Sequence, residues 1–310
     1  MRQDRTVTAL AGGVGGAKLL VGLQRATESG RLTAIVNTGD DAAFYGVHVS
    51  PDVDIVTYWL AGVADTARGW GLEGDTFAMV GALERLGGEA WFQLGDRDLA
   101  TCMLRTQRLA AGASLSGATD ELRRALGVPT RILPMSDDAV RTRLECTDGR
   151  TLEFQEYFVR ERTRPDVTKV SFDGIAQAEP APGVIAGISA ADLVVLCPSN
   201  PILSLAPILG LDGVRDALRA HACVVAVTPI VRGAALKGPA DRLLEGLGGS
   251  ATASGVAALY GDFCDLFVVD ASDAAEAEAV KALGVPSAAL DTIMTDHAAA
   301  ERLAVELLEL

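Results

Sequence analysis

Short apolar runs alternate with amphipathic stretches along most of this 310-residue chain. The runs that predict buried strands are Thr6–Leu10, Leu32–Asn37, Asp192–Cys197, Cys223–Thr228, Leu266–Asp270 and Ala288–Asp291. Windows with helical spacing lie between or after several of them, at Val214–Ala220, Ala274–Leu283 and Asp296–Leu308. Because strands and helices alternate, we expect an α/β fold with a doubly wound, largely parallel, Rossmann-like sheet.

The middle of the chain has a different pattern. It is mostly helical from about Gly74 to Leu126, most clearly at Asp96–Gly112 and Ser116–Leu126. Apolar and polar residues then alternate on both sides of the turn Thr147-Asp148-Gly149, which predicts a hairpin. The expected strands there are Arg141–Cys146 and Thr151–Val159, with a possible third at Val167–Phe172.

These patterns divide the chain into a core and an insertion. We expect residues 1–70 and 176–310 to form the Rossmann-like core and its sheet. Residues 71–175 would then be an insertion, helical at first and an antiparallel hairpin afterwards. A hydrophobic content of 49% with only 5% aromatic residues suits helices packed on a parallel sheet.

The net charge limits what the protein can bind, and the cysteine content indicates its compartment. A formal charge of −14 argues against a nucleic-acid or anionic-membrane partner, because both demand a basic surface. The five cysteines include no closely spaced pair, which is typical of reduced, cytoplasmic proteins. The uncharged stretch Leu193–Leu211 carries three prolines, so we expect a strand and a loop there and no membrane span.

A glycine cluster, Gly12-Gly13-Val14-Gly15-Gly16-Ala17-Lys18, follows the first predicted strand. A glycine-rich turn into a helix offers backbone N–H groups and a helix N-terminus, which together bind anions. The spacing fits neither the dinucleotide fingerprint G-x-G-x-x-G nor a P-loop, since Leu19 follows Lys18 where a P-loop has Ser or Thr. We predict a phosphate site at Gly12, Gly13, Gly15, Gly16 and Lys18; the alternative is a tight turn whose glycines serve only close packing.

Four carboxylates lie close to this cluster in sequence. Asp40 and Asp41 come shortly after the second predicted strand, and Asp52 and Asp54 lie a little further along the chain. Carboxylate oxygens are the ligands that Mg²⁺ prefers, and the missing P-loop hydroxyl leaves these four residues as the natural metal ligands. A phosphate site beside a metal site indicates phosphate-ester chemistry.

A second loop at the same sheet edge contains Pro198-Ser199-Asn200-Pro201. Ligands of open α/β sheets bind at the carboxyl ends of the strands. The two prolines fix the backbone, so Ser199 and Asn200 are candidates for hydrogen bonds to a base or sugar. The alternative is a rigid structural turn.

Three cationic side chains are further candidates for binding an anionic ligand. Arg232 and Lys237 follow a later strand, and Arg97 either contacts an anion or organises the carboxylates. Its neighbours Asp96 and Asp98 are candidate N-caps of the following helix. The three histidines are scattered, which gives no support to Ser-His-Asp catalysis.

Nine segments in order over nearly the whole chain resemble the 2-phospho-L-lactate transferases of deazaflavin coenzyme F-420 biosynthesis. They are Ala11-Gly12-Gly13-Val14-Gly15-Gly16-Ala17-Lys18, Val36-Asn37-Thr38-Gly39-Asp40-Asp41, Ser50-Pro51-Asp52-Val53-Asp54, Gly69-Trp70-Gly71, Leu94-Gly95-Asp96-Arg97-Asp98, Leu133-Pro134-Met135-Ser136-Asp137-Asp138, Pro198-Ser199-Asn200-Pro201-Ile202, Lys237-Gly238-Pro239-Ala240 and Thr292-Ile293-Met294-Thr295-Asp296.

The resemblance implies a Mg²⁺-dependent transfer to the ribityl 5′-hydroxyl of the deazaflavin Fo. The donor would be guanosine diphosphate-activated 2-phospholactate, phosphoenolpyruvate or 3-phosphoglycerate, and the products would be (dehydro)coenzyme F-420-0 and GMP. Asp40, Asp41 and Asp54 are the expected catalytic residues, and the resemblance places Asp54 where the deazaflavin binds. Which aspartates bind metal, and which group acts as base, stay open.

The remaining roles follow from combining the resemblance with the residues. The glycine loop and Lys18 would hold the donor phosphates, Ser199 and Asn200 would face the guanosine, and Arg97 would lie near the acceptor. A homodimer is the default for a cytoplasmic enzyme. The alternatives are a nucleotide-sugar-like or kinase-like transferase and a non-catalytic nucleotide-binding regulator, although four carboxylates beside a phosphate site favour catalysis.

Overall fold

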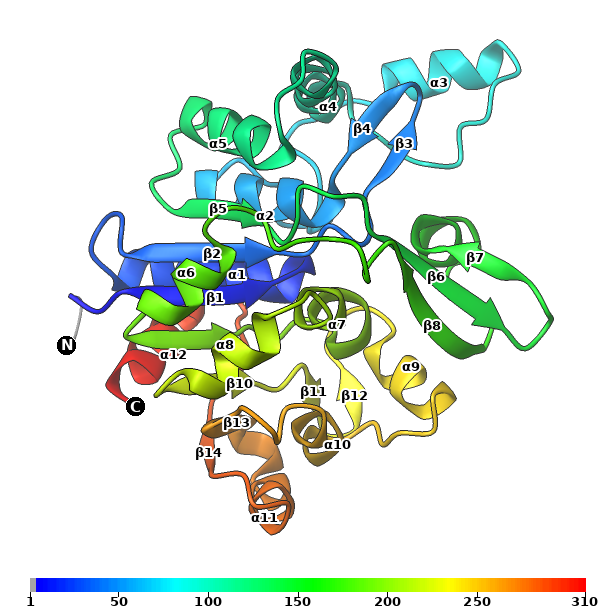
Figure 1. Ribbon diagram of the computed structural model, residues 1–310. Coiled ribbons are helices and arrows are strands. Elements are labelled where there is room, and N and C mark those ends of the chain that lie inside the picture. Colours follow the sequence, from blue (N-terminus) through cyan, green and yellow to red (C-terminus); the bar gives the residue numbers. More distant parts are fainter. Residues whose placement is uncertain (1–3) are drawn as a thin grey trace.

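A computed structural model describes residues 4–310 of the chain (Figure 1). Its centre is a parallel seven-stranded sheet in the spatial order β5-β2-β1-β9-β10-β13-β14. These strands are β1 (Val7–Ala11), β2 (Leu32–Val36), β5 (Arg131–Pro134), β9 (Leu193–Leu196), β10 (Val224–Val227), β13 (Leu266–Asp270) and β14 (Ser287–Leu290). The first six run 3-2-1-4-5-6 along the sheet in their own order of appearance, which is the Rossmann order. The expected fold class is confirmed.

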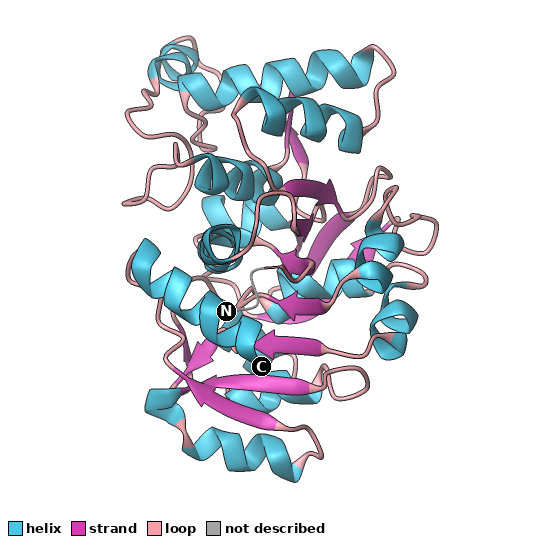
Figure 2. Ribbon diagram, turned by 90° about the vertical axis from the view of Figure 1, so that its left-hand side faces the viewer, coloured by secondary structure: helices cyan, strands magenta, loops and turns pink. Residues whose placement is uncertain are grey.

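Helices cover both faces of the sheet, and this explains why the strands are continuously apolar (Figure 2). One face packs against α1 (Gly13–Ala26), α2 (Pro51–Ala61) and α12 (His297–Glu309). The other packs against α6 (Val184–Ala190), α7 (Ala206–Leu209), α8 (Val214–Ala220), α9 (Ala240–Gly246), α10 (Ala253–Ala258) and α11 (Ala275–Ala282). The result is a three-layer α/β/α architecture with a separate hydrophobic cluster on each side of the sheet.

The middle of the chain builds the upper part of Figure 1 and the small sheet on its right. Three helices, α3 (Ala78–Arg85), α4 (Asp96–Ala110) and α5 (Leu115–Ala125), precede β5. An antiparallel sheet in the order β7-β6-β8 follows, made of β6 (Arg141–Cys146), β7 (Thr151–Glu153) and β8 (Val167–Asp173). The remaining elements are the hairpins β3 (Ala42–Phe44) with β4 (Val47–Val49) and β11 (Ile230–Val231) with β12 (Ala234–Ala235), and the short turns η1 (Glu156–Arg160), η2 (Pro201–Leu205) and η3 (Ala271–Asp273).

Two expectations about the middle of the chain were wrong. The sheet is not formed by the two chain ends alone, because β5 pairs with β2 and comes from within residues 71–175. The second hairpin strand does not reach Val159, because the chain turns into the π-helical η1 and buries Tyr157 beside Leu144. The third strand at β8 is confirmed. The division into core and insertion at residues 70 and 176 stays a prediction.

The fold brings the candidate loops to one edge of the sheet. β1 lies between β2 and β9, so the glycine loop after β1 is flanked by the loops that carry Asp40 and Ser199. The strand order changes direction between β1 and β9, and ligands of open α/β sheets bind at such a point. No helix within residues 4–310 is long and apolar enough to cross a membrane.

Candidate active site

The glycine loop is held by side chains from both neighbouring loops. Gly12 donates its N–H to Ser199 Oγ at 3.0 Å, and the Ser199 hydroxyl donates to the Gly12 carbonyl at 2.8 Å. Gly13, the first residue of α1, donates its N–H to Asp52 Oδ1 at 2.8 Å. A Cβ atom on Gly12 would lie 2.4 Å from Asp52 Oδ2, and one on Gly15 would lie 2.4 Å from the Pro198 carbonyl oxygen. Close packing is therefore one reason for glycine at these two positions.

Three buried carboxylates, Asp40, Asp41 and Asp52, lie beside this loop. Asp52 Oδ2 accepts from the Asn37 amide at 3.0 Å, so Asp52 is anchored through both oxygens. Asp40 Oδ1 accepts a long hydrogen bond of 3.4 Å from the Thr142 hydroxyl on β6. Three of the four predicted metal ligands thus lie around the glycine loop, although their carboxylate oxygens do not all come within 4.8 Å of one another.

Asp41 has one satisfied and one unsatisfied oxygen. Its Oδ2 accepts from the Ser50 hydroxyl at 2.6 Å and lies 2.9 Å from His48 Nε2. Its Oδ1 is buried and has no hydrogen-bond partner within residues 4–310. A buried carboxylate oxygen without a partner is costly, and a bound cation or hydrogen-bond donor would remove that cost.

Burial and mutual repulsion disfavour the charged forms of the clustered carboxylates. Burial raises the pKa of Asp40 well above its ordinary value, and the nearby charges of Asp52 and Asp41 raise it further. Burial also raises the pKa of Asp52 to about 6, although the hydrogen bonds from Asn37 and Gly13 act against it. Within residues 4–310, neither Asp40 nor Asp52 forms an ion pair. A divalent cation would relieve the mutual repulsion of these carboxylates.

Asp54 has a different environment from the other three aspartates. Arg105 of α4 donates to both of its oxygens, from Nη1 to Oδ2 at 3.0 Å and from Nη2 to Oδ1. The Arg105 side chain is 1% exposed. Burial raises the pKa of Asp54 despite this guanidinium. Asp54 is thus part of a buried ion pair, and its predicted contacts with metal and deazaflavin stay predictions.

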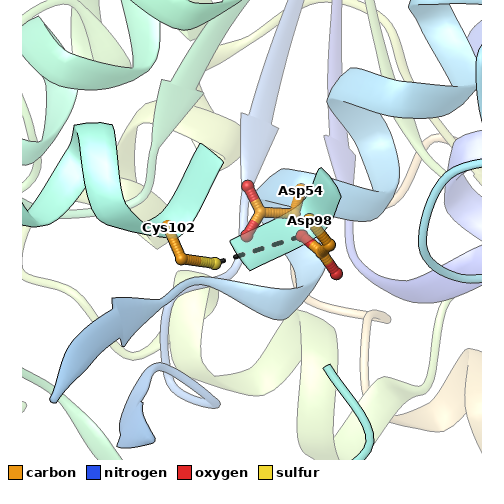
Figure 3. A group of neighbouring side chains, drawn as sticks. All are labelled: Asp54, Asp98 and Cys102. Atoms are coloured by element: carbon orange, nitrogen blue, oxygen red, sulfur yellow. Dashed lines mark hydrogen bonds between the residues drawn. The ribbon is translucent and has the colours of Figure 1, made fainter. Parts of the chain in front are cut away.

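Asp54, Asp98 and Cys102 form the one group in the described chain whose His, Cys, Asp or Glu ligand atoms come within 4.8 Å of one another (Figure 3). Burial raises the pKa of the Cys102 thiol, which keeps it protonated, and it lies 3.9 Å from Arg105 Nη1. Asp98 accepts from the Tyr58 hydroxyl at 2.8 Å, and burial raises its pKa to about 7. Because Arg105 already supplies the positive charge, we interpret this group as a buried ion-pair network.

Two lysines converge near the first turn of α1. Lys18 Nζ donates to the Met294 carbonyl at 2.9 Å, and Lys237 Nζ donates to the Arg68 carbonyl at 3.0 Å. Gly69, with φ +89°, lies between Lys237 and Val14; its Cβ would be 2.3 Å from Lys237 Nζ. Partial burial and the charge of Lys18 lower the pKa of Lys237. Neither lysine is ion-paired within residues 4–310, so no carboxylate there neutralises their charges.

Ser199 and Asn200, which we predicted to bind a base or sugar, form hydrogen bonds within the protein. Ser199 is buried, and its hydroxyl both donates to and accepts from Gly12, so this geometry leaves its side chain no donor for a guanosine. Asn200 Oδ1 caps η2 by accepting from Ile202 and Leu203 N–H. These contacts of Ser199 and Asn200 favour the alternative of a structural turn for this loop. The Asn200 amide nitrogen forms no hydrogen bond within residues 4–310.

The two candidate arginines are not brought to the carboxylate cluster. Arg97 Nη1 donates to the Glu73 carbonyl at 3.0 Å, and Arg232 Nε donates to the Ser272 carbonyl at 3.3 Å. The expected N-cap at the start of α4 was also wrong. Asp75 accepts there from the N–H groups of Arg97 and Asp98, while Asp96 caps α3 instead.

Several site residues escaped the sequence analysis. Asn37, His48, Ser50, Thr142 and Arg105 all contact the predicted aspartates. Asn37 could have been found from the sequence, because it is the last residue of a predicted strand and so lies at the edge of the sheet where ligands bind. No sequence feature marked Arg105 as a site residue, because an arginine in an amphipathic helix usually faces solvent.

Comparisons with known proteins agree over the full length. The sequence profile described as 2-phospho-L-lactate transferase CofD matches residues 7–309. A phosphoenolpyruvate transferase of Streptomyces griseus is 42% identical over 98% of this chain and 98% of its own. A 2-phospho-L-lactate transferase of Methanosarcina mazei is 39% identical over 95% of this chain and 96% of its own. The crystal structure of a UPF0052-family protein from Bacillus halodurans shares the fold, with a TM-score of 0.66 and 18% identity over 99% of each chain.

Proposed function

The chain belongs to the 2-phospho-L-lactate transferase family, whose members are phospho-acid transferases of coenzyme F-420 biosynthesis, and from this premise we propose its reaction. It transfers 2-phospholactate, phosphoenolpyruvate or 3-phosphoglycerate from a guanosine diphosphate-activated donor to the ribityl 5′-hydroxyl of Fo. The acceptor oxygen forms a bond to the phosphorus that carries the acid, and the bond from that phosphorus to GMP breaks. The hydroxyl proton leaves to a base that is not yet identified.

The observation that carries this proposal is the buried Asp41 Oδ1, which has no hydrogen-bond partner in the described part of the chain and lies beside Asp40 and Asp52. These oxygens fit a hard divalent cation, and Asp40 and Asp41 are the residues that would hold Mg²⁺. Asp52 and Asp54 are weaker candidates, because each is already engaged through both oxygens. When bound, Mg²⁺ supplies charge neutralisation on the donor diphosphate.

The protein's own groups orient the donor. The N-terminus of α1 carries partial positive charge at the glycine loop, and Lys18 and Lys237 add two full charges near its first turn. These groups suit a diphosphate in an otherwise acidic protein. Phosphoryl-type transfer needs positioning and charge stabilisation more than covalent chemistry from the protein, and this is what the site offers.

The remaining assignments rest on the resemblance more than on geometry. The amide of Asn200 is the remaining candidate for the guanosine in its loop, while Arg97 and Arg232 keep a role only if ligand binding moves them from their present carbonyl partners. A cytoplasmic location and a homodimer also belong to this proposal.

The test is product analysis. Purified protein is incubated with Fo, Mg²⁺ and each of the three guanylylated phospho-acids, and the products are identified by mass spectrometry. We expect one donor to give GMP and the matching phospho-acid ester of Fo. If Fo is unchanged with every donor while guanosine nucleotide still binds, the chain is a nucleotide-binding regulator.

A further inference from the structure

His48 lies on β4, in the hairpin that begins directly after Asp41. Its neighbours Val47 and Val49 point into an apolar cluster that includes Cys102 of α4. Side chains alternate along a strand, so His48 points to the other side, where its Nε2 meets Asp41 Oδ2 at 2.9 Å. The His48 side chain is 25% exposed, so it does not belong to the hydrophobic core.

Both backbone groups of His48 are held by α4. The His48 N–H donates to Thr106 Oγ1 at 2.7 Å, and its carbonyl accepts from Arg105 Nη1 at 3.3 Å. The Thr106 hydroxyl in turn donates to the Cys102 carbonyl at 2.7 Å. β4 pairs with β3 along one edge only, so these bonds fix the edge that has no strand partner.

The same Arg105 guanidinium binds both oxygens of Asp54. One buried side chain therefore ties α4 to α2 and to the strand that carries His48. His48, which these contacts hold in place, in turn helps to fix the rotation of the Asp41 carboxylate. With Oδ2 bound by His48 and Ser50, the other oxygen, Oδ1, is left without a partner among residues 4–310.

We propose that His48 is a positioning residue for Asp41 and that Thr106 and Arg105 of α4 hold it in place. The inference rests on the proposed role of Asp41 as a ligand of a divalent cation. A partner that fixes the rotation of a ligating carboxylate improves metal binding without touching the metal. Ser50 still holds Asp41 when His48 is lost, so the effect on metal affinity is a weakening and not a complete loss.

The test is direct binding of Mn²⁺, followed by electron paramagnetic resonance at fixed pH, in five forms of the full chain. These are the wild type, His48→Ala, His48→Gln, Thr106→Val and Thr106→Ser. Gln keeps an N–H donor for Asp41, and Ser keeps the hydroxyl that accepts from the His48 N–H. We expect His48→Ala to raise the Mn²⁺ Kd about 10-fold, Thr106→Val to raise it less, and the two conservative variants to bind close to the wild type.

Activity separates positioning from loss of fold. In His48→Ala, the Mn²⁺ concentration for half-maximal transfer should rise with the Kd, while the rate at saturating Mn²⁺ and the KM for Fo change little. Equal Mn²⁺ affinity in His48→Ala and wild type overturns the inference and leaves the proposed function intact. If His48→Ala does not fold, the Thr106→Val and Thr106→Ser pair decides in the same way. A wild type that binds no Mn²⁺ overturns both the inference and the metal site on which it rests.

Discussion

Arg105 donates to both carboxylate oxygens of Asp54 across the interface between α4 and α2, and both side chains are almost completely buried. The pair links the helical middle of the chain to the helix that opens with Asp52 and Asp54. Planar two-point pairing of this kind is the strong form of ion pair, but each charge is costly to bury without the other. The position of α2, which carries Asp52, therefore depends on a contact outside the group formed by Asp40, Asp41 and Asp52.

Removing one partner should destabilise the fold strongly. We expect Arg105→Met or Asp54→Ala to lower the free energy of unfolding by about 3–5 kcal/mol, because each leaves an unpaired buried charge. The measurement is urea denaturation of each single variant and of the double variant Arg105→Met/Asp54→Leu. The double variant should recover most of the loss; if it is as unstable as the sum of the single variants, the two charges are not coupled.

Asp98 should make stability depend on pH. Burial raises its pKa to about 7 from an ordinary value of 3.8, so the folded state keeps a proton that the unfolded state loses between these values. The stabilising contribution is complete below pH 4 and is lost as the pH rises through 7. We expect Asp98→Asn, which cannot ionise, to match the wild type near pH 4 and to exceed its stability at pH 8 by at least about 1 kcal/mol. Thermal denaturation of both proteins between pH 4 and pH 8 tests this prediction. A stability difference between Asp98→Asn and the wild type that does not change with pH would refute the raised pKa of Asp98.

Gly15 should tolerate no side chain. A Cβ there would lie 2.4 Å from the Pro198 carbonyl oxygen, and backbone cannot move aside as a flexible side chain can. Gly15→Ala should therefore cost about 1–3 kcal/mol of stability. Gly81→Ala in α3 is the matched control, because its nearest contact would be an ordinary 3.7 Å, and it should be neutral or slightly stabilising. Equal effects of the two substitutions would contradict the packing argument.

Lys18 and Lys237 should serve the donor and not the acceptor. Lys18→Met and Lys237→Met each remove one charged hydrogen bond to an anion, worth about 1.5–3 kcal/mol, so we expect the donor KM to rise roughly 10- to 100-fold. The KM for Fo should change little. The exposed Lys281, paired with Glu278, gives the control Lys281→Met. A rise in the KM for Fo with an unchanged donor KM would place the two lysines at the acceptor.

The alternating strands and helices could be predicted from sequence because period and apolar content are local properties. The loops at the carboxyl edge followed from them, since consecutive parallel strands deliver their ends to one side. β5 escaped because it has only four residues, begins with an exposed arginine and ends with a proline. A segment this short shows neither an alternating nor a continuous apolar pattern that would distinguish a strand from the neighbouring helices.

The partners inside the site could not be predicted, because they depend on contacts between distant residues. The hydroxyl of Ser199, which we expected to contact a ligand, forms hydrogen bonds with Gly12, 187 positions away, and these favour the structural-turn alternative. Arg105 and Asp54 are 51 positions apart, and no period relates them. The sequence pattern therefore predicts which loops share one edge of the sheet, but packing decides which of their polar atoms stay free.

The most direct test of the central claim is the rate of transfer to Fo as a function of free Mg²⁺, in the wild type and in Asp41→Asn. Asp41→Asn keeps the shape of the side chain and removes the charge that the unpartnered oxygen carries. We predict no transfer by the wild type in EDTA, full recovery on adding Mg²⁺, and a much higher Mg²⁺ requirement or no recovery in Asp41→Asn. Full activity in EDTA, or an unchanged Mg²⁺ requirement in Asp41→Asn, would contradict the proposed site.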